Sequence, residues 1–224
     1  MVKAKEFRIP FTWEERRIMI EDAVWFLPPN MPHDPFVLAN WGQLFTDPNK
    51  PVKVEYCSGN GSWIVERAKA HPEYNWLAVE KDFERTRLIW ARAKNAALEN
   101  FAIAFAEGVE LTKRFFPSAS VSEIFVNFPD PWPKRRHAKH RIIRAEFVEE
   151  LARIIPSQGA ACLVTDNEEY SAIMIQEMVA NPHFTSEFGP PHYVEADSGY
   201  GTSFFDSLFR SQSKHIRLHR FVRK

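Results

Sequence analysis

Residues 54–62 read VEYCSGNGS, an apolar run that leads into a turn containing Gly59 and Gly61. A helical pattern follows at once over residues 62–70. Glycines between a strand and a helix let a ligand approach the backbone, and the helix N-terminus supplies free N–H groups. We therefore predict the first strand–turn–helix of an α/β fold. On these residues alone, the turn either holds a ligand or is only a turn.

The pattern of residues 54–62 continues through the rest of the chain, where short apolar runs alternate with helical ones. This alternation predicts β-α-β crossovers and a mainly parallel sheet. We expect strands at 52–57, 76–80, 102–105, 122–127, 160–165, 184–188 and 216–222. We expect helices at 62–70, 82–95, 109–115, 144–155 and 168–179.

The N-terminal part of the chain is less regular, with six prolines in residues 1–50. One amphipathic helix is expected over about 12–27. We interpret residues 1–45 as an arm, packed on the domain or flexibly attached to it. Residues 46–224 then form a single α/β domain, a length sufficient for one sizeable core.

Glu80 closes the second expected strand and strengthens the case for a cofactor site. An acid at this position can accept hydrogen bonds from the two ribose hydroxyls of a nucleotide-like cofactor. The third glycine of a GxGxxG dinucleotide motif is missing, since Ser62-Trp63-Ile64 follows Gly61. This favours an adenosyl cofactor over NAD, although Glu80 can also be read as a surface acid.

Residues 127–137, NFPDPWPKRRH, follow the fourth expected strand. Three prolines make this loop rigid and exclude a helix. It lies at the carboxyl end of a strand, where ligands bind in open α/β sheets. Trp132 offers a stacking surface for a base, and the basic residues that follow offer contacts for phosphates. The alternative is a rigid structural loop with a buried tryptophan.

The 224-residue chain carries no net charge, with 29 basic and 29 acidic residues, but the basic residues are unevenly distributed. Two clusters contain no acid: Lys134, Arg135, Arg136, Lys139, Arg141 and Arg144, then Arg210, Lys214, Arg217, Arg220, Arg223 and Lys224. Such clusters indicate a nucleic-acid partner, or else solvated basic faces. No apolar run reaches the roughly 20 residues of a membrane helix, and no secretory signal is present.

The two cysteines, Cys57 and Cys162, show no metal-ligand spacing, so we expect no metal site and two buried, reduced thiols. We expect a cytoplasmic protein. The sequence does not distinguish a monomer from a homodimer.

The chain closely resembles the bacterial tRNA (guanine-N7)-methyltransferase family, the TrmB-like enzymes, over roughly residues 40–224. The resemblance rests on Phe128-Pro129-Asp130-Pro131-Trp132 with Lys134, and on Thr165-Asp166 with Tyr170; Glu55, Gly59, Gly61 and Glu80 add to it. It implies a Rossmann-like class I methyltransferase fold. In that fold a seven-stranded, mostly parallel sheet ends in an antiparallel strand and carries helices on both faces.

The resemblance also implies an activity, in which S-adenosylmethionine methylates N7 of the guanine at position 46 in the tRNA variable loop. The implied cofactor-binding residues are Glu55, Gly59, Gly61, Glu80, Glu107 and Asp130. Asp130 is also the implied catalytic residue, while Lys134, Asp166, Ser203 and Asp206 match substrate-binding positions. From their place in the basic loop we add Trp132, Arg135, Arg136 and Arg141 to the substrate-binding set.

The chain departs from the family pattern at three places. Cys57 stands where the family has a glycine, and Glu107 replaces an aspartate. Ser203-Phe204-Phe205-Asp206 replaces Thr-Lys-Phe-Glu. Two rival functions stay open: a small-molecule methyltransferase on the same fold, and a non-catalytic RNA-binding relative. An NAD oxidoreductase fits less well, because the third glycine and a proton-relay pair are missing.

Overall fold

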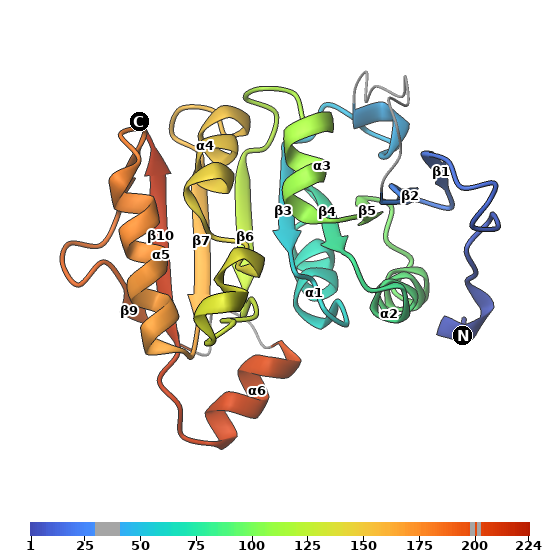
Figure 1. Ribbon diagram of the computed structural model, residues 1–224. Coiled ribbons are helices and arrows are strands. Elements are labelled where there is room, and N and C mark those ends of the chain that lie inside the picture. Colours follow the sequence, from blue (N-terminus) through green and yellow to red (C-terminus); the bar gives the residue numbers. More distant parts are fainter. Residues whose placement is uncertain (30–40, 198–199, 201–202) are drawn as a thin grey trace. The chain divides into compact units, whose positions relative to one another are not determined.

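The computed structural model describes residues 1–29, 41–197, 200 and 203–224, apart from the side chain of Arg135. The chain divides into two compact units, an N-terminal unit (Met1–Phe116) and a C-terminal unit (Pro117–Lys224). Figure 1 shows strands and surrounding helices in each unit. No described helix is long and apolar enough to cross a membrane.

The N-terminal unit contains a sheet with the strand order β1-β2-β5-β4-β3. Its strands are β1 (Met19–Glu21), β2 (Val24–Phe26), β3 (Val52–Tyr56), β4 (Asn75–Glu80) and β5 (Phe101–Phe105). Its helices are the short 3-10 helices η1 (Ala4–Glu6) and η2 (Trp41–Gln43), and α1 (Ser62–Ala70), α2 (Phe83–Asn95) and α3 (Gly108–Phe115). Strands β3, β4 and β5 are parallel, as predicted.

The central strands of this unit, β3, β4 and β5, are buried along nearly their whole length, as is usual for parallel strands covered on both faces. All six residues of β4 are buried. Helices α1 and α2 pack on each other and on β4. A side chain at Gly61 would place its Cβ 2.9 Å from Cγ1 of Ile89 in α2. Gly61 therefore lets the start of α1 approach α2 closely.

The helix predicted over residues 12–27 is wrong, because this segment holds the hairpin β1–β2. Glu21 pairs with Val24, which leaves Asp22 and Ala23 as a two-residue turn with φ of 51° and 60°. Positive φ at both positions is the geometry of a type I′ hairpin turn. Strand β2 is fully buried and pairs in parallel with β5, so its three residues need cover on both faces.

The C-terminal unit contains strands in the order β6-β7-β10-β8, and β9 also pairs with β10. Its strands are β6 (Glu123–Asn127), β7 (Ala160–Thr165), β8 (Phe184–Ser186), β9 (Val194–Glu195) and β10 (Arg217–Arg223). Its helices are the 3-10 helix η3 (Arg135–His140), α4 (Ala145–Ile154), α5 (Glu168–Ala180) and α6 (Phe204–Ser211).

The strand directions of this unit match the predicted sheet. Strands β6 and β7 are parallel, and β10 is antiparallel to β7, as a class I methyltransferase fold requires. All seven expected strands are present, and β1, β2 and β9 are additional. Helix α6 was not predicted. Its only apolar clusters are Phe204-Phe205 and Leu208-Phe209, a pattern too short for periodicity to indicate a helix.

Candidate functional site

The turn after β3 has an unusual backbone, with left-handed conformations at three alternate residues. The φ angles are 61° at Cys57, 58° at Gly59 and 74° at Gly61. Glycine adopts this region freely, whereas cysteine does so at a steric cost. A Cβ added at Gly59 would approach only the carbonyl oxygen of Cys57, at 3.9 Å. The turn therefore leaves open space beside Gly59.

Glu80 connects this turn to the end of β4. Its Oε2 accepts a hydrogen bond from the Gly59 amide at 2.8 Å, and its Oε1 accepts from the amides of Lys81 and Asp82 at 2.9 Å each. Burial raises the pKa of Glu80, although the amides of Asp82 and Gly59 oppose the shift. A carboxylate has about four acceptor positions, and three are filled here. One position remains for a ligand hydroxyl.

The other two acids expected at the cofactor differ from each other in exposure. Glu55 in β3 is buried, with 2% of its surface exposed. Glu107 is exposed and caps α3, since its Oε2 accepts a hydrogen bond from the Glu110 amide at 2.9 Å. The longer side chain of glutamate, in place of aspartate, still reaches this amide. Glu107 therefore fixes the start of the helix that follows β5.

These residues of the N-terminal unit fit an adenosyl cofactor. Glu80 is an acceptor-only group suited to ribose hydroxyls, and Gly59 leaves the backbone accessible. Among the residues that the structure describes, no group of three or more His, Cys, Asp or Glu side chains could hold a metal ion.

In the C-terminal unit, the loop after β6 holds Asp130 and is fixed at both sides. The Phe128 amide donates to the carbonyl of Val164 in β7 at 2.8 Å. Arg141 donates from Nε to the carbonyl of Pro131 at 2.8 Å and from Nη2 to that of Trp132 at 3.0 Å. The Asp130 carboxylate is exposed and has no hydrogen-bond or ion-pair partner among the described residues.

Two bulky residues of this loop take left-handed conformations, with φ of 48° at Phe128 and 43° at Trp132. Such backbone is rare for large side chains, and it persists where the surroundings hold it. The Trp132 ring lies 5.6 Å from the His137 ring and 5.3 Å from the His140 ring, centroid to centroid. Trp132 is half-buried, so part of its ring surface is accessible, and its substrate role stays a prediction.

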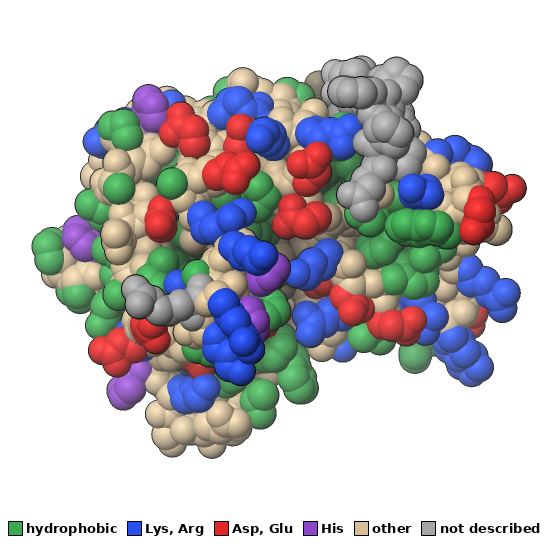
Figure 2. All heavy atoms as spheres, in the orientation of Figure 1, with side chains coloured by type: hydrophobic (Ala, Val, Ile, Leu, Met, Phe, Trp, Pro, Cys, Tyr) green, Lys and Arg blue, Asp and Glu red, His purple; other side chains and the backbone are tan. Residues whose placement is uncertain are grey.

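The two predicted basic clusters differ in their partners. Lys134, Arg136 and Lys139 are exposed and have no partner among the described residues. We call these three residues the η3 cations. Figure 2 shows Lys and Arg side chains, with His among them, over the yellow-green segment of Figure 1 that contains η3. The side chain of Arg135 lies outside the described part of the chain.

The C-terminal basic cluster is instead engaged within the fold. Arg217 pairs with Glu168 at 3.5 Å, and Arg220 pairs with Glu123 and Glu187. Arg223 and Lys224 donate to the backbone carbonyls of Ala152 and Pro182, respectively. The phosphate contacts predicted from this cluster therefore compete with internal partners.

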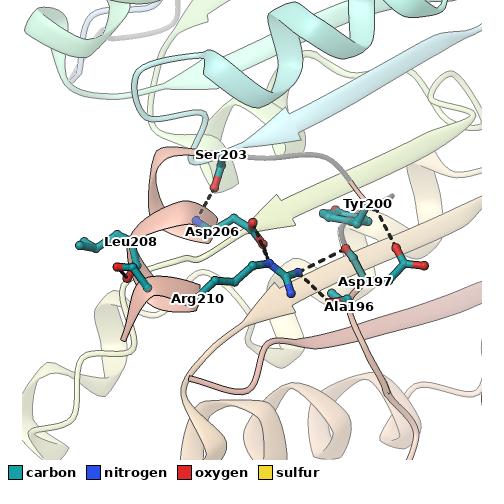
Figure 3. Close-up of polar contacts among 8 residues, drawn as sticks. Ala196, Asp197, Tyr200, Ser203, Asp206, Leu208 and Arg210 are labelled. Carbon is teal, nitrogen blue, oxygen red and sulfur yellow. Dashed lines mark hydrogen bonds and ion pairs between the residues drawn. The ribbon is translucent and has the colours of Figure 1, made fainter. Parts of the chain in front are cut away.

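Ser203 and Asp206 both stabilise α6. Ser203 caps the helix, since its Oγ accepts from the Asp206 amide at 2.9 Å. Asp206 is 3% exposed and binds Nε of Arg210 at 3.1 and 2.9 Å through its two oxygens. Arg210 also donates to the carbonyls of Ala196 and Asp197, as Figure 3 shows. The substrate contacts of Ser203 and Asp206 stay predictions.

Asp166 follows β7 directly, and its side chain is 14% exposed. Its Oδ2 accepts from Nζ of Lys214 at 2.5 Å. Strands β6 and β7 are parallel, so the Asp130 loop and Asp166 lie at the same edge of the C-terminal unit.

Some residues at this edge were not predicted individually. Lys214 was predicted only as one of a basic cluster, and no sequence signal singled it out. No pattern in the sequence indicated that Tyr200 contacts the end of β6, where its hydroxyl donates to Asn127 Oδ1 at 2.7 Å. A packing role for Phe128 at this edge was likewise not predicted.

The two cysteines differ in solvent exposure. Cys162 is buried beside Glu123, as predicted, and burial raises its pKa. Cys57 is exposed, so the prediction of a buried thiol there is wrong. The left-handed conformation at the end of β3 turns residue 57 out of the strand's buried face.

Comparisons with known proteins agree with this geometry. A family model described as "Putative methyltransferase" matches residues 49–211. The tRNA (guanine-N(7)-)-methyltransferase of Chlamydia felis is 38% identical over 224 residues, which is 100% of this chain and 98% of the relative.

Solved structures show the same fold. TrmN from Thermus thermophilus matches with a TM-score of 0.57 at 18% identity, over 78% of this chain and 44% of that one. A SAM dependent methyltransferase from Aquifex aeolicus matches with a TM-score of 0.55 at 12% identity, over 78% and 83%. With full-length sequence similarity and a Rossmann-like methyltransferase fold together, this chain belongs to the tRNA (guanine-N7)-methyltransferase family.

Proposed function

We propose that the protein transfers a methyl group from S-adenosylmethionine to N7 of the variable-loop guanine at position 46 of tRNA. The observation that carries this proposal is the fixed loop after β6, which presents the exposed Asp130 carboxylate, without a partner among the described residues, and leads in the sequence to the exposed η3 cations. A tRNA substrate also suits a cytoplasmic enzyme. Full-length similarity to enzymes named tRNA (guanine-N(7)-)-methyltransferase supports the proposal.

The cofactor half of the reaction belongs to the N-terminal unit in this proposal. Bound S-adenosylmethionine supplies an electrophilic methyl group. Glu80 accepts a ribose hydroxyl with its remaining acceptor position. Gly59 leaves space beside the turn, and Gly61 lets α1 begin close to α2. Glu55 and Glu107 complete the set as acids near the cofactor, Glu107 through the helix start that it caps.

Asp130 acts on the guanine. N7 carries a lone pair and no proton, so its methylation needs no general base. The product base is cationic, and a carboxylate fixed in advance lowers the energy of the developing charge. The hydrogen bonds from Arg141 to the carbonyls of Pro131 and Trp132 hold this loop in place, so Asp130 requires little rearrangement to act. Asp166 accepts hydrogen bonds from the N1–H and N2–H₂ groups of the same guanine.

The η3 cations and Trp132 bind the surrounding RNA. Lys134 and Arg136, with Arg135 between them, contact backbone phosphates, and Trp132 stacks on an unstacked base. Binding of phosphates to the η3 cations breaks no internal ion pair, because these cations have none among the described residues. Ser203, Asp206 and Arg141 contribute by shaping the C-terminal unit, and any direct contact with RNA comes in addition.

The first test separates a tRNA substrate from a small molecule. Formation of S-adenosylhomocysteine is measured with unmodified tRNA, with the same tRNA digested to nucleosides, and with no acceptor. We expect turnover only with intact tRNA. Equal turnover with nucleosides would favour the small-molecule methyltransferase. Tight tRNA binding without turnover would favour the non-catalytic RNA-binding relative.

A further inference from the structure

The C-terminal basic cluster contacts two predicted substrate-binding acids among the described residues: Arg210 pairs with Asp206, which is 3% exposed, and Lys214 pairs with Asp166, which is more accessible. Strand β10 is antiparallel to β7, and Arg217 lies opposite Thr165. This register brings the segment before β10 beside the residue that follows β7. The backbone topology therefore delivers Lys214 to Asp166.

Lys214 is held in position yet remains accessible. Its amide donates to the Phe209 carbonyl at 3.0 Å, and its Nζ lies 4.1 Å from the centroid of the Phe209 ring. Phe209 itself packs on Phe128 of the Asp130 loop, with ring centroids 5.5 Å apart. The Lys214 side chain is 41% exposed. An ammonium has three donors, so donors remain beyond the one that Asp166 accepts.

Asp166 also keeps acceptor capacity. Only Oδ2 binds Lys214, and Oδ1 has no hydrogen-bond partner among the described residues. Side by side, the pair therefore offers a free acceptor on the carboxylate and free donors on the ammonium. The Watson–Crick edge of guanine is complementary to this pair: N1–H and N2–H₂ donate to a carboxylate, and O6 accepts from an ammonium. Adenine carries a donor amino group at position 6 and an acceptor at N1.

We propose that Lys214 is a specificity residue that donates a hydrogen bond to O6 of the guanine held by Asp166. This inference rests on the proposed function and assigns the reading of the base to two adjacent side chains. Adenine would place its 6-amino group against the ammonium and its N1 against the carboxylate, so the remaining ammonium donors and Oδ1 of Asp166 would find no partner on the base. A site that hydrogen-bonds one base discriminates against another that leaves its donors and acceptors unmatched.

The test uses tRNAs that carry guanosine, inosine or 2-aminopurine riboside at the methylated position. Inosine lacks only the 2-amino group of guanosine, whereas 2-aminopurine lacks O6 and the N1 proton. For each tRNA, kcat/KM is measured with the wild-type protein, with Lys214→Met and with Lys94→Met. Lys94 is a matched control, because it is 43% exposed and also ion-paired to an aspartate, Asp22.

In the wild type we expect guanosine to be preferred over both analogues. Loss of a charged hydrogen bond to O6 should reduce the preference for guanosine over 2-aminopurine about tenfold in Lys214→Met. The preference over inosine should stay unchanged, because O6 is present in both bases. Lys94→Met should change neither ratio.

Two results would overturn the inference. If Lys214→Met lowers every rate equally and alters no ratio, Lys214 is only structural. If both preferences fall together, Lys214 acts only by placing Asp166. Failure of the proposed function is seen separately, as a wild-type protein that methylates no guanosine-containing tRNA at all.

Discussion

Cys57 occupies a left-handed position, φ 61°, in a turn whose other left-handed residues are glycines. A residue with a Cβ loses about 1–2 kcal/mol in this conformation. Replacing Cys57 by glycine would remove this cost, but it would also make the unfolded chain more flexible, which offsets part of the gain in stability. The exposed Cys57 side chain thus costs stability without adding to the core.

We expect Cys57→Gly to raise the free energy of unfolding by about 0.5–1 kcal/mol, because it relieves the left-handed strain. Cys57→Ala retains the Cβ and should give no such gain. Denaturant unfolding of the three proteins measures the difference. Equal gains from glycine and alanine would show that the thiol, and not the backbone, is the source of the cost.

Asp130 gives the second prediction at the residue scale. Asp130→Asn keeps the shape of an exposed side chain that has no partner in the described part of the chain, so the fold should not change. We expect kcat to fall at least about tenfold, because the amide stabilises a cationic guanine less well. Dissociation of S-adenosylmethionine, measured by calorimetry, should change much less. Near wild-type turnover in the variant would remove Asp130 from the catalytic role.

His219 shows how burial in the C-terminal unit couples stability to pH. The ring is fully buried, its Nδ1 donates to the His192 carbonyl at 3.0 Å, and its Nε2 accepts from Ser171 Oγ at 3.1 Å. Burial lowers the pKa of His219 from 6.5 to about 4. Below pH 6.5 the unfolded chain therefore takes up a proton that the folded protein refuses until about pH 4.

Stability is accordingly complete above pH 6.5 and is lost as the pH falls toward 4, with a slope of up to about 1.4 kcal/mol per pH unit from this group. His219→Gln should flatten the dependence in that window. His183→Gln, at an exposed position, is the control. Urea unfolding at several pH values measures both, and an unchanged slope in His219→Gln would contradict the assignment.

At the scale of single elements, the sequence predicted the regular strands and helices because their apolar periodicity is strong. Helix α1 was predicted with its observed ends, Ser62–Ala70. The hairpin β1–β2 was missed because its turn, Asp22-Ala23, lacks the Asn-Gly or Asp-Gly signal of a type I′ turn. Its burial depends on β5, about 80 residues later in the chain, and local pattern cannot reveal such a partner.

The segment η3 carries the element-scale prediction about RNA. Lys134→Gln, Arg136→Gln and Lys139→Gln together remove three exposed charges. We expect weaker tRNA binding and a salt dependence of log Kobs that is shallower by about 2 units or more. The matched control removes Lys5, Lys69 and Arg92, which are exposed on the N-terminal unit. Binding that weakens equally in both triple variants would contradict a specific grip by η3.

At the scale of the whole molecule, the predicted family and fold class are confirmed, whereas the contacts of individual side chains were only partly predicted. The strand order follows from β-α-β connections, which physics restricts to few arrangements. The partners of individual side chains cannot be deduced from these connections. Arg210 reaches Asp206 and Arg141 clasps the Asp130 loop through contacts that only the folded chain creates. The positions of basic residues in the sequence therefore did not distinguish those in internal ion pairs from exposed ones without a partner among the described residues.

The decisive measurement is nucleoside analysis of unmodified tRNA after reaction with labelled S-adenosylmethionine and the purified protein. We expect label in 7-methylguanosine, and loss of that label when the variable-loop guanosine at position 46 is replaced by another nucleoside. Label in a different nucleoside, or 7-methylguanosine that survives the replacement, would contradict the proposed reaction or its site.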